Sequence, residues 1–166
     1  MKLRLLAPDD EAAATAAHAE LLRENFEFLL AYRTGMEWLD YLAQTEDARF
    51  GRNLPEGWVP ATFLVADVDG GLVGRASIRH ELNQHLFEVG GHIGYAVRPQ
   101  FRGRGYATEM LRLALGEARS LGIATALLTC DPDNFASHAV IERNGGVREV
   151  NSAPISQDKL RYWIPT

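Results

Sequence analysis

The residues with the clearest chemical meaning lie at 97–108, where glycine and arginine alternate just before an amphipathic segment. The sequence there reads Val-Arg-Pro-Gln-Phe-Arg-Gly-Arg-Gly-Tyr-Ala-Thr. Gly103 and Gly105 can adopt positive φ, which lets backbone N–H groups converge on an oxyanion. Arg102 and Arg104 add positive charge, and the following helix adds the positive end of its dipole. We therefore predict a phosphate-binding loop between a strand and a helix.

The segments on either side of the loop must position it. Residues 91–97 predict an apolar strand, and Pro99 ends the hydrogen-bonding ladder of that strand. Beyond the loop, apolar residues recur with helical spacing at Ala107, Met110, Leu111, Ala114, Leu115 and Ala118. Gly122 then marks the expected end of the helix.

Two other kinds of phosphate-binding loop have a different spacing. The Walker pattern G-x-x-x-x-G-K-[ST] does not occur in the sequence. The dinucleotide pattern G-x-G-x-x-G can begin at Gly103, but Thr108 occupies its third glycine position. Neither alternative is therefore predicted.

The segment Arg102-Gly103-Arg104-Gly105-Tyr106-Ala107 resembles the R/Q-x-x-G-x-G/A pyrophosphate motif of the GNAT superfamily of N-acetyltransferases. The order of a strand before the motif, a long helix after it and a further strand at 123–130 is similar to that family as well. Downstream, the pattern N-x-x-S-x-x-x-I-E-x-x-G is matched by Asn134, Ser137, Ile141, Glu142 and Gly145. The chain is most similar to bacterial-type members described only as predicted acetyltransferases.

This resemblance implies the GNAT fold over one domain, residues 1–166. The fold is α/β, with a mixed central sheet of about six to seven strands that splays between its fourth and fifth strands and is flanked by helices. Acetyl-CoA is then the donor substrate, with its pantetheine arm in the fork between 95–97 and 128–130. The implied contacts are Tyr95, Ala96, Val97, Arg102, Gly103, Arg104, Gly105, Tyr106, Ala107, Thr108, Asn134 and Ser137.

Length and composition agree with one soluble domain. The 166 residues, 46% of them hydrophobic, suffice for a substantial core. The net charge of −5 argues against a nucleic-acid surface, which needs a basic face. Cys130 is the only cysteine, which excludes an internal disulfide framework, and no metal site is indicated. Without a signal peptide or an apolar run of about 18 residues, we expect a cytoplasmic protein that does not bind membranes.

The rest of the chain predicts alternating helices and strands. Asp69-Gly70-Gly71 is a strong hairpin signal, and residues 8–11 begin a helix whose apolar face continues to Leu30. Residues 51–60 are predicted as the longest irregular stretch, near the acceptor site. The other predicted elements are strands at 3–6, 61–68, 72–80, 86–97, 123–130, 147–151 and 160–164 and helices at 36–42 and 134–144.

Direct attack of an amine on a thioester needs a neutral amine, a stabilised oxyanion and a proton for the leaving thiolate. Backbone N–H groups at 95–97 are expected to polarise the carbonyl. His92 is the leading candidate for the base, because it resembles in position a glutamate of many family members. A histidine hydrogen-bonded within the sheet is the equal alternative, and Glu88, His80 and Arg79 are rivals. If 86–97 is one unbulged strand, Glu88 and His92 share a face.

The acid is less well defined by the sequence. Many family members carry a tyrosine seven residues after the asparagine of the fourth helix, where this chain has Ile141. Ser137, a water molecule or no dedicated acid remain as alternatives. Asn134 is either a helix cap or a pantetheine ligand. We interpret Cys130 as a small buried residue rather than as an acyl-carrying nucleophile.

Together these patterns predict an acetyl-CoA-dependent N-acetyltransferase acting on a primary amine of a small molecule or amino-acid-like acceptor. A noncatalytic acyl-CoA sensor and a protein N-acetyltransferase are the alternatives. No nucleic-acid partner is expected, and a homodimer is left open. Glu24, Asn25 and Glu56 are candidates for attracting a cationic amine, although the sequence does not identify the acceptor.

Overall fold

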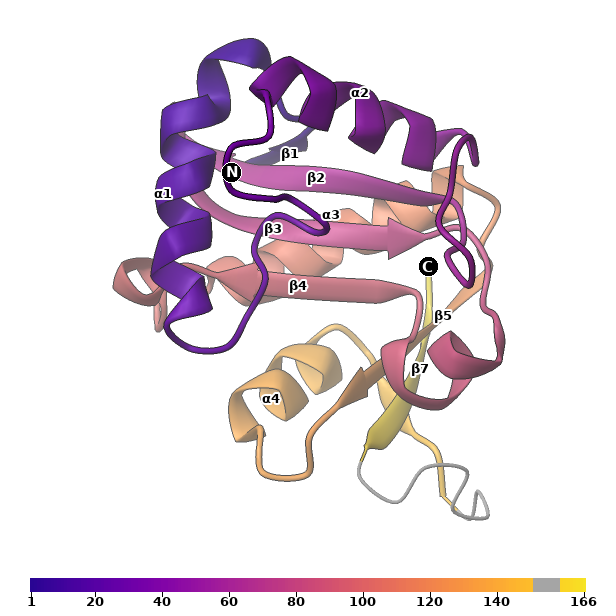
Figure 1. The fold of residues 1–166 in the computed structure, drawn as a ribbon. Helices are drawn as coiled ribbons and strands as arrows, with labels where there is room; N and C mark the ends of the chain where they lie inside the picture. The colour runs from indigo at the N-terminus through magenta and orange to yellow at the C-terminus, as the bar shows by residue number, and fades with distance from the viewer. Residues whose placement is uncertain (151–158) are drawn as a thin grey trace.

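The computed structural model describes residues 1–150 and 159–166 (Figure 1). Short helical turns at Pro8–Asp10, Leu86–Gly90 and Pro99–Phe101 connect the longer elements. The helices and strands follow one another as β1 (Lys2–Arg4), α1 (Glu11–Leu22), α2 (Trp38–Arg49), β2 (Ala61–Val68), β3 (Gly71–Arg79), β4 (Ile93–Val97), α3 (Tyr106–Ser120), β5 (Thr125–Cys130), α4 (Phe135–Arg143), β6 (Val147–Arg148) and β7 (Leu160–Pro165).

The strands form two sheets that part between β4 and β5. One sheet has the order β1-β2-β3-β4 and the other has the order β5-β7-β6. No ladder joins β4 to β5 in the described residues, so the predicted splay is present. Pairing inside each sheet is antiparallel throughout, whereas the sequence predicted mixed pairing. The fork therefore leaves the facing backbone edges of β4 and β5 largely open.

Helices cover both faces of the larger sheet (Figure 1). α1 and α2 lie on one face, and α3 lies on the other. The buried face of α3 packs against both sheets through Met110, Leu111, Ala114, Leu115 and Ala118, the residues whose spacing predicted this helix. A second core holds α1 and α2 against β2 through residues such as Tyr41 and Phe63. These two cores hold β4 and the loop before α3 in place.

The loop and helix predicted from residues 99–122 are confirmed. α3 begins at Tyr106, directly after Gly105 at φ +79°, and ends before Gly122 at φ +85°. The N–H of Ile123 donates to the carbonyl of Ala118, which closes the helix end. The hairpin is confirmed too, because Asp69 and Gly70 both adopt positive φ between β2 and β3.

The prediction of one strand over 86–97 is wrong in its first half. Residues Leu86–Gly90 form a helical turn, and β4 begins only at Ile93. Asn83 Oδ1 accepts from the N–H of Leu86 at 2.9 Å, which caps this turn as an asparagine caps a helix. Gly91 then turns the chain at φ +64°. Glu88 and His92 therefore do not share a strand face.

The first helix is shorter than its apolar pattern suggested. α1 ends at Leu22, because Asn25 adopts φ +56° and the backbone turns back to bond Leu21. His18 Nδ1 accepts from the N–H of Leu29 at 3.0 Å, so the returning chain is fastened to α1. Residues 23–37 thus form a longer irregular segment than residues 50–60, contrary to the prediction.

Three smaller expectations concern other features. The strand predicted at 147–151 is observed at Val147–Arg148, and residue 151 lies outside the described residues. No helix in the described part of the chain is long and apolar enough to cross a membrane. Within the same residues, no group of three or more histidine, cysteine, aspartate or glutamate side chains is arranged to hold a metal ion.

Candidate functional site

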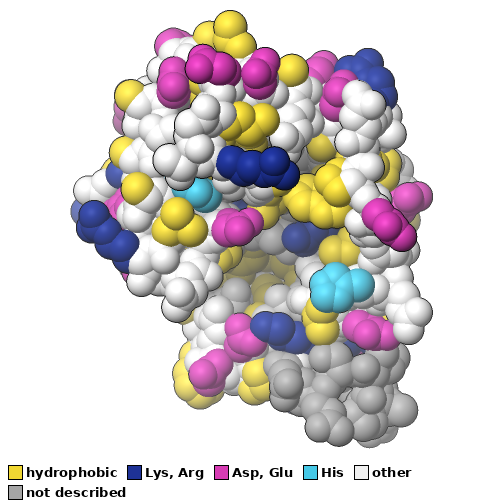
Figure 2. All heavy atoms as spheres, viewed as in Figure 1, with side chains coloured by type: hydrophobic (Ala, Val, Ile, Leu, Met, Phe, Trp, Pro, Cys, Tyr) yellow, Lys and Arg dark blue, Asp and Glu magenta, His cyan; other side chains and the backbone are white. Residues whose placement is uncertain are grey.

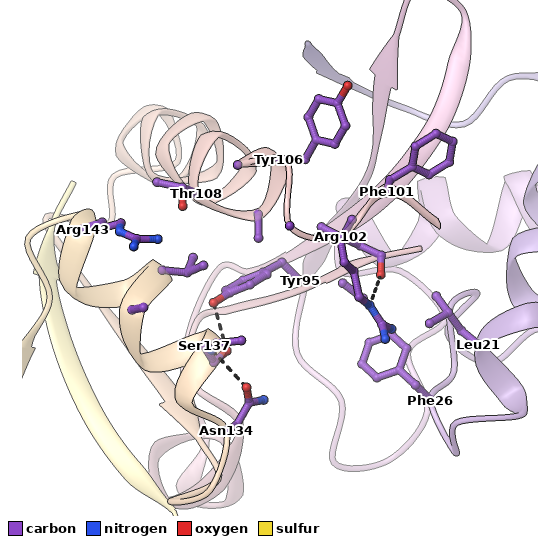
Figure 3. Close-up of a pocket in the computed structure, with 18 of the residues that line it drawn as sticks. Leu21, Phe26, Tyr95, Phe101, Arg102, Tyr106, Thr108, Asn134, Ser137 and Arg143 are labelled. Carbon is purple, nitrogen blue, oxygen red and sulfur yellow. Dashed lines mark hydrogen bonds between the residues drawn. The ribbon is translucent and has the colours of Figure 1, made fainter. Parts of the chain in front are cut away.

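A cavity of about 610 Å³ lies beside β4, between the start of α3 and the inner face of α4 (Figure 3). Eleven of the twelve predicted cofactor contacts line it, and Arg104 is the exception. The predicted contacts in its wall are Tyr95, Ala96, Val97, Arg102, Gly103, Gly105, Tyr106, Ala107, Thr108, Asn134 and Ser137. Segments from both sides of the fork therefore meet at one cavity.

The loop at the mouth of the cavity is shaped by its two glycines. Gly103 and Gly105 adopt φ of +74° and +79°, and a Cβ added to either would meet no atom within 4 Å. Their requirement for glycine is therefore conformational rather than steric. The positive φ at Gly105 turns the chain into α3, whose first residues, Tyr106, Ala107 and Thr108, line the cavity. Such an arrangement can hold a phosphate by backbone donors.

The two arginines of the loop lie differently. Arg102 Nε donates to the carbonyl of Val97 at 3.1 Å, and its guanidinium pairs with Glu24 at 2.6 Å. This pairing lowers the pKa of the Glu24 carboxyl. Glu24, a candidate for attracting an amine, is therefore already held by a cation. Arg104 is exposed and lies over the Phe101 ring at 5.9 Å.

Tyr95 reaches from β4 across the fork to α4. Its hydroxyl shares a hydrogen bond with Ser137 Oγ at 3.0 Å, and both residues line the cavity (Figure 3). Burial raises the pKa of Tyr95 to about 12, although the bond to Ser137 opposes this. The phenol thus stays protonated at neutral pH. The sequence analysis assigned only a backbone role to Tyr95 and did not identify its hydroxyl as part of the site. The tyrosine in the Gly-Tyr-Ala-Val segment was the signal that could have indicated this role.

Asn134 performs the capping role that the sequence left open. Its Oδ1 accepts from the N–H of Ser137 at 3.0 Å at the start of α4, while the residue also lines the cavity. Capping fixes the first turn of α4 and with it the direction of the Ser137 side chain. Ile141, which replaces the usual tyrosine, is buried in the core and does not line the cavity.

His92 is buried and joins the two sheets instead of facing the cavity. The ring Nδ1 of His92 accepts from the backbone N–H of Leu127 at 2.9 Å, and the backbone N–H of His92 donates to the Leu127 carbonyl at 2.7 Å. Burial, and secondarily the charge of Arg79, lower the pKa of the ring. A neutral ring that accepts at Nδ1 carries its proton on Nε2 and has no lone pair left for a substrate. This geometry fits the sheet-bonded histidine and does not support the general base.

The rivals of His92 also lie outside the lining of the cavity. His80 Nε2 shares a hydrogen bond with Thr62 Oγ1 at 2.8 Å. Arg79 Nη1 donates to the carbonyls of Gly90 and Gly91 at 3.0 and 3.3 Å. Glu88 is bonded by the amide of Gln84 in the helical turn. None of these groups is therefore positioned at the cavity to take a proton.

Cys130 behaves as a buried apolar residue. Burial raises the pKa of its thiol to about 11, so the thiolate that a nucleophile needs is disfavoured at neutral pH. The side chain packs in the main core, as expected from the sequence. Sequence reasoning did not identify the remaining wall residues as part of the site: Leu21, Phe26, Phe101, Ala136, Ala139, Val140 and Arg143.

A family model described as an acetyltransferase (GNAT) domain matches residues 1–147 of this chain. The matched range contains both sides of the cavity, from Leu21 to Arg143.

Two curated proteins are similar over about half of the chain. Mycothiol acetyltransferase from Streptomyces coelicolor is 34% identical over 93 residues, which are 55% of this chain and 29% of that protein. Mycothiol acetyltransferase from Streptomyces avermitilis is 35% identical over 92 residues, which are 54% of this chain and 29% of that protein. The matched region is thus less than a third of the length of these relatives.

Solved structures resemble almost the whole chain. Mycobacterium smegmatis RimJ in complex with CoA-disulfide has a TM-score of 0.69 at 23% identity, covering 98% of this chain and 80% of its own. The microcin C7 self-immunity acetyltransferase MccE, in complex with acetyl-CoA and AMP, has a TM-score of 0.66 at 17% identity, covering 99% and 91%. A variant of spermidine N-acetyltransferase SpeG from Vibrio cholerae scores 0.63 at 20% identity, covering 99% and 95%. At these identities the likeness shows a shared fold.

Proposed function

Because the chain belongs to the GNAT acetyltransferase family, we propose that it transfers the acetyl group of acetyl-CoA to a primary amine of a small or amino-acid-like acceptor. One observation carries this proposal: a single cavity joins the glycine-rich loop to the open edge of β4. The first can hold a pyrophosphate, and the second can pair with the amides of pantetheine. A thioester at the end of that arm would then lie within the fork.

The residues of the cavity fit acetyl-CoA in two separate ways. Gly103 and Gly105 leave the space beside the loop free, so a phosphate can approach the backbone closely. On β4, residues 95–97 border the cavity, and within 1–150 and 159–166 no strand pairs with the β4 edge that faces β5. Acetyl-CoA supplies an activated acetyl group, and these segments bind and orient it. Arg102 also lines the cavity, where its guanidinium is paired with Glu24.

We propose direct transfer without an acyl-enzyme. The amine nitrogen attacks the acetyl carbonyl carbon, so a C–N bond forms and the C–S bond breaks. Backbone N–H groups of residues 95–97 stabilise the charge that develops on the carbonyl oxygen. The attacking nitrogen loses one proton, and the leaving sulfur gains one. The high pKa of the Cys130 thiol supports a route that does not use this residue.

Ser137 is our candidate for delivering the proton to the leaving sulfur. Its hydroxyl lines the cavity and shares a hydrogen bond with Tyr95, whose raised pKa keeps the phenol protonated. Tyr95 can thus replace the proton that Ser137 gives up, and solvent can restore the pair. The proton of the amine is proposed to leave through water, because the Nδ1 lone pair of His92 is already engaged by Leu127.

Calorimetric titration with acetyl-CoA, followed by a free-thiol assay on the same preparation, tests this proposal. The acceptor panel contains amines, amino acids and peptides with free amino groups. We expect saturable binding and acceptor-dependent thiol release. Binding without release from any acceptor would favour an acyl-CoA sensor, release only with peptides would favour a protein acetyltransferase, and absence of binding would overturn the proposal.

A further inference from the structure

Three polar side chains lie along one face of β3, outside the cavity described above: Arg75 and Ser77 are buried, and Arg79 is half-buried. Arg75, Ser77 and Arg79 alternate along the strand, so all three project to the same side of the sheet. Across the ladder, Ser77 pairs with Gly94 and Arg75 pairs with Ala96 of β4. A row of buried polar groups on a sheet face is unusual and requires a partner.

The two guanidinium groups converge on the position where Gly94 lacks a side chain. A Cβ on Gly94 would lie 3.4 and 3.6 Å from Nη1 and Nη2 of Arg79 and 3.8 Å from Nη1 of Arg75. Gly94 itself is half-buried. Figure 2 shows a hollow near the centre of the face that carries α1 and α2, with the surface of a basic side chain at its edge.

Neutral groups satisfy these arginines only in part. Arg75 Nη2 donates to the carbonyl of Glu27 at 3.1 Å, and Nη1 makes a long 3.5 Å contact with that of Gly94. Arg79 Nη1 donates to two further carbonyls at 3.0 and 3.3 Å. Arg75 Nε and Ser77 Oγ are buried without a partner in the described residues. Over those same residues, no carboxylate lies within ion-pair distance of either guanidinium.

The electrostatics of this pair favour an anion. Burial, and secondarily the neighbouring charge of Arg79, lower the pKa of Arg75 to about 10. Tyr41 and Glu27 act in the opposite direction but more weakly. Burial also lowers the pKa of Arg79. A buried and a half-buried cation without a counterion are costly, and a bound anion would offset both the desolvation and the mutual repulsion.

We propose that Arg75, Ser77 and Arg79 form a subsite around Gly94 for the carboxylate of an amino-acid acceptor. The planar fork of a guanidinium matches the two oxygens of a carboxylate, and the serine hydroxyl adds a donor. Ala96 lies two residues after Gly94 on the same face of β4, pairs with Arg75 across the ladder and lines the cavity, so the subsite adjoins the cavity. This proposal rests on the proposed acetyl transfer and narrows its acceptor to an amine that carries an anion. A cationic polyamine would be repelled.

The test compares acceptors that differ only in the anion. Each amino acid is assayed beside its own carboxamide at saturating acetyl-CoA, with thiol release as the readout. For the natural chain, kcat/KM should favour the acid by about 10-fold or more, because charge-assisted hydrogen bonds would be lost with the carboxamide. Equal rates for acid and carboxamide would overturn the proposal.

Two substitutions make the test specific to this place. Gly94→Ala fills the point of convergence at a position without positive φ, and Arg79→Gln removes one cation. In both variants, kcat/KM for the amino acid should become nearly equal to kcat/KM for its carboxamide, while the affinity for acetyl-CoA is kept. Gly116→Ala is the matched control, since its added methyl group on α3 meets no atom within 4 Å. A preference for the acid that survives both substitutions would also overturn the proposal.

A binding measurement separates this proposal from the proposed function. The arginine Nε–H signals are followed by ¹⁵N NMR while the common amino acids, and then their carboxamides, are titrated into the protein. Arg75→Lys and Arg79→Lys identify the two signals. Shifts of both signals with an amino acid but not with its carboxamide support the subsite, even if no thiol is released. Unchanged signals across the panel contradict it, whatever the acetyl-CoA titration shows.

Discussion

Two regions beside β4 gather positive charge, and they do so by different means. In the loop at 102–108, two glycines at positive φ let the backbone and the start of α3 supply the donors. On β3, the side chains of buried Arg75 and half-buried Arg79 supply them, and both guanidinium groups lie close to Gly94 of the neighbouring strand. The first region is local in sequence, and the second exists only because β3 and β4 are paired. A backbone site is therefore recognisable from a short motif, whereas a side-chain site depends on its neighbours in space.

The largest loss of function should come from Gly105→Val, which changes the backbone of the glycine-rich loop. A β-branched residue at φ +79° is strained, so the loop must change shape. We expect acetyl-CoA affinity to fall by about 100-fold, which corresponds to the upper part of the strain usually stored at such positions. Calorimetric titration measures the loss.

Gly57→Val provides the matched control for this substitution. Gly57 has φ +79° and equally open surroundings, but it does not line the cavity. This variant should lose stability without losing acetyl-CoA affinity. Equal losses of affinity in the two variants would show that backbone strain as such, rather than the loop, controls binding.

Ser137→Ala should have the next largest effect, and it acts on the chemistry rather than on binding. Removal of the hydroxyl should lower kcat by about 50-fold, near the lower end of what a positioned acid contributes, because a thiolate is a good leaving group. The capping bond from the Ser137 N–H to Asn134 remains, so α4 should keep its first turn. An unchanged kcat would remove Ser137 as the proton donor.

His92→Ala should cost stability, since it leaves the buried N–H of Leu127 without its acceptor. The free energy of unfolding should fall by about 2 kcal/mol, measured by urea denaturation. His92→Asn offers an amide oxygen to the same N–H and should recover part of the loss. If His92→Asn folds well but loses turnover, the general base predicted from the sequence regains support.

The same histidine should make stability depend on pH. The pKa of His92 is lowered in the folded chain, so the unfolded chain takes up a proton first as the pH falls through about 6.5. Stability should therefore decrease on acidification below that pH. Burial also lowers the pKa values of His18 and His80. His92→Asn should therefore reduce the dependence of stability on pH without abolishing it. Thermal unfolding across a pH series provides the comparison.

Tyr95→Phe should have the smallest effect, a fall in kcat of about 5-fold with little change in acetyl-CoA affinity. The ring can keep its packing, while Ser137 loses the hydrogen bond that spans the fork. A larger fall than that of Ser137→Ala would assign the direct proton transfer to the tyrosine. No fall at all would mean that solvent restores Ser137 without it.

The sequence was most informative where one segment carries its own signal. The apolar spacing of α3 and the hairpin at Asp69 and Gly70 predicted elements that are confirmed. Prediction failed where a side chain some residues away redirected the backbone. Asn83 turns 86–90 into a helical turn, and His18 fastens the chain that follows α1. Apolar residues in these segments fit a strand or a helix equally well, so periodicity does not decide between them.

By itself, the sequence determined the glycine-rich loop, the helix behind it and the family to which both belong, because backbone conformation and apolar spacing are local properties. Only the tertiary structure decided which residues from distant parts of the chain contact one another. It brings Tyr95 to Ser137 over 42 positions of the chain, and His92 to Leu127 over 35. Contacts of this kind arise from how two sheets and their helices pack, and no spacing within a single segment encodes them.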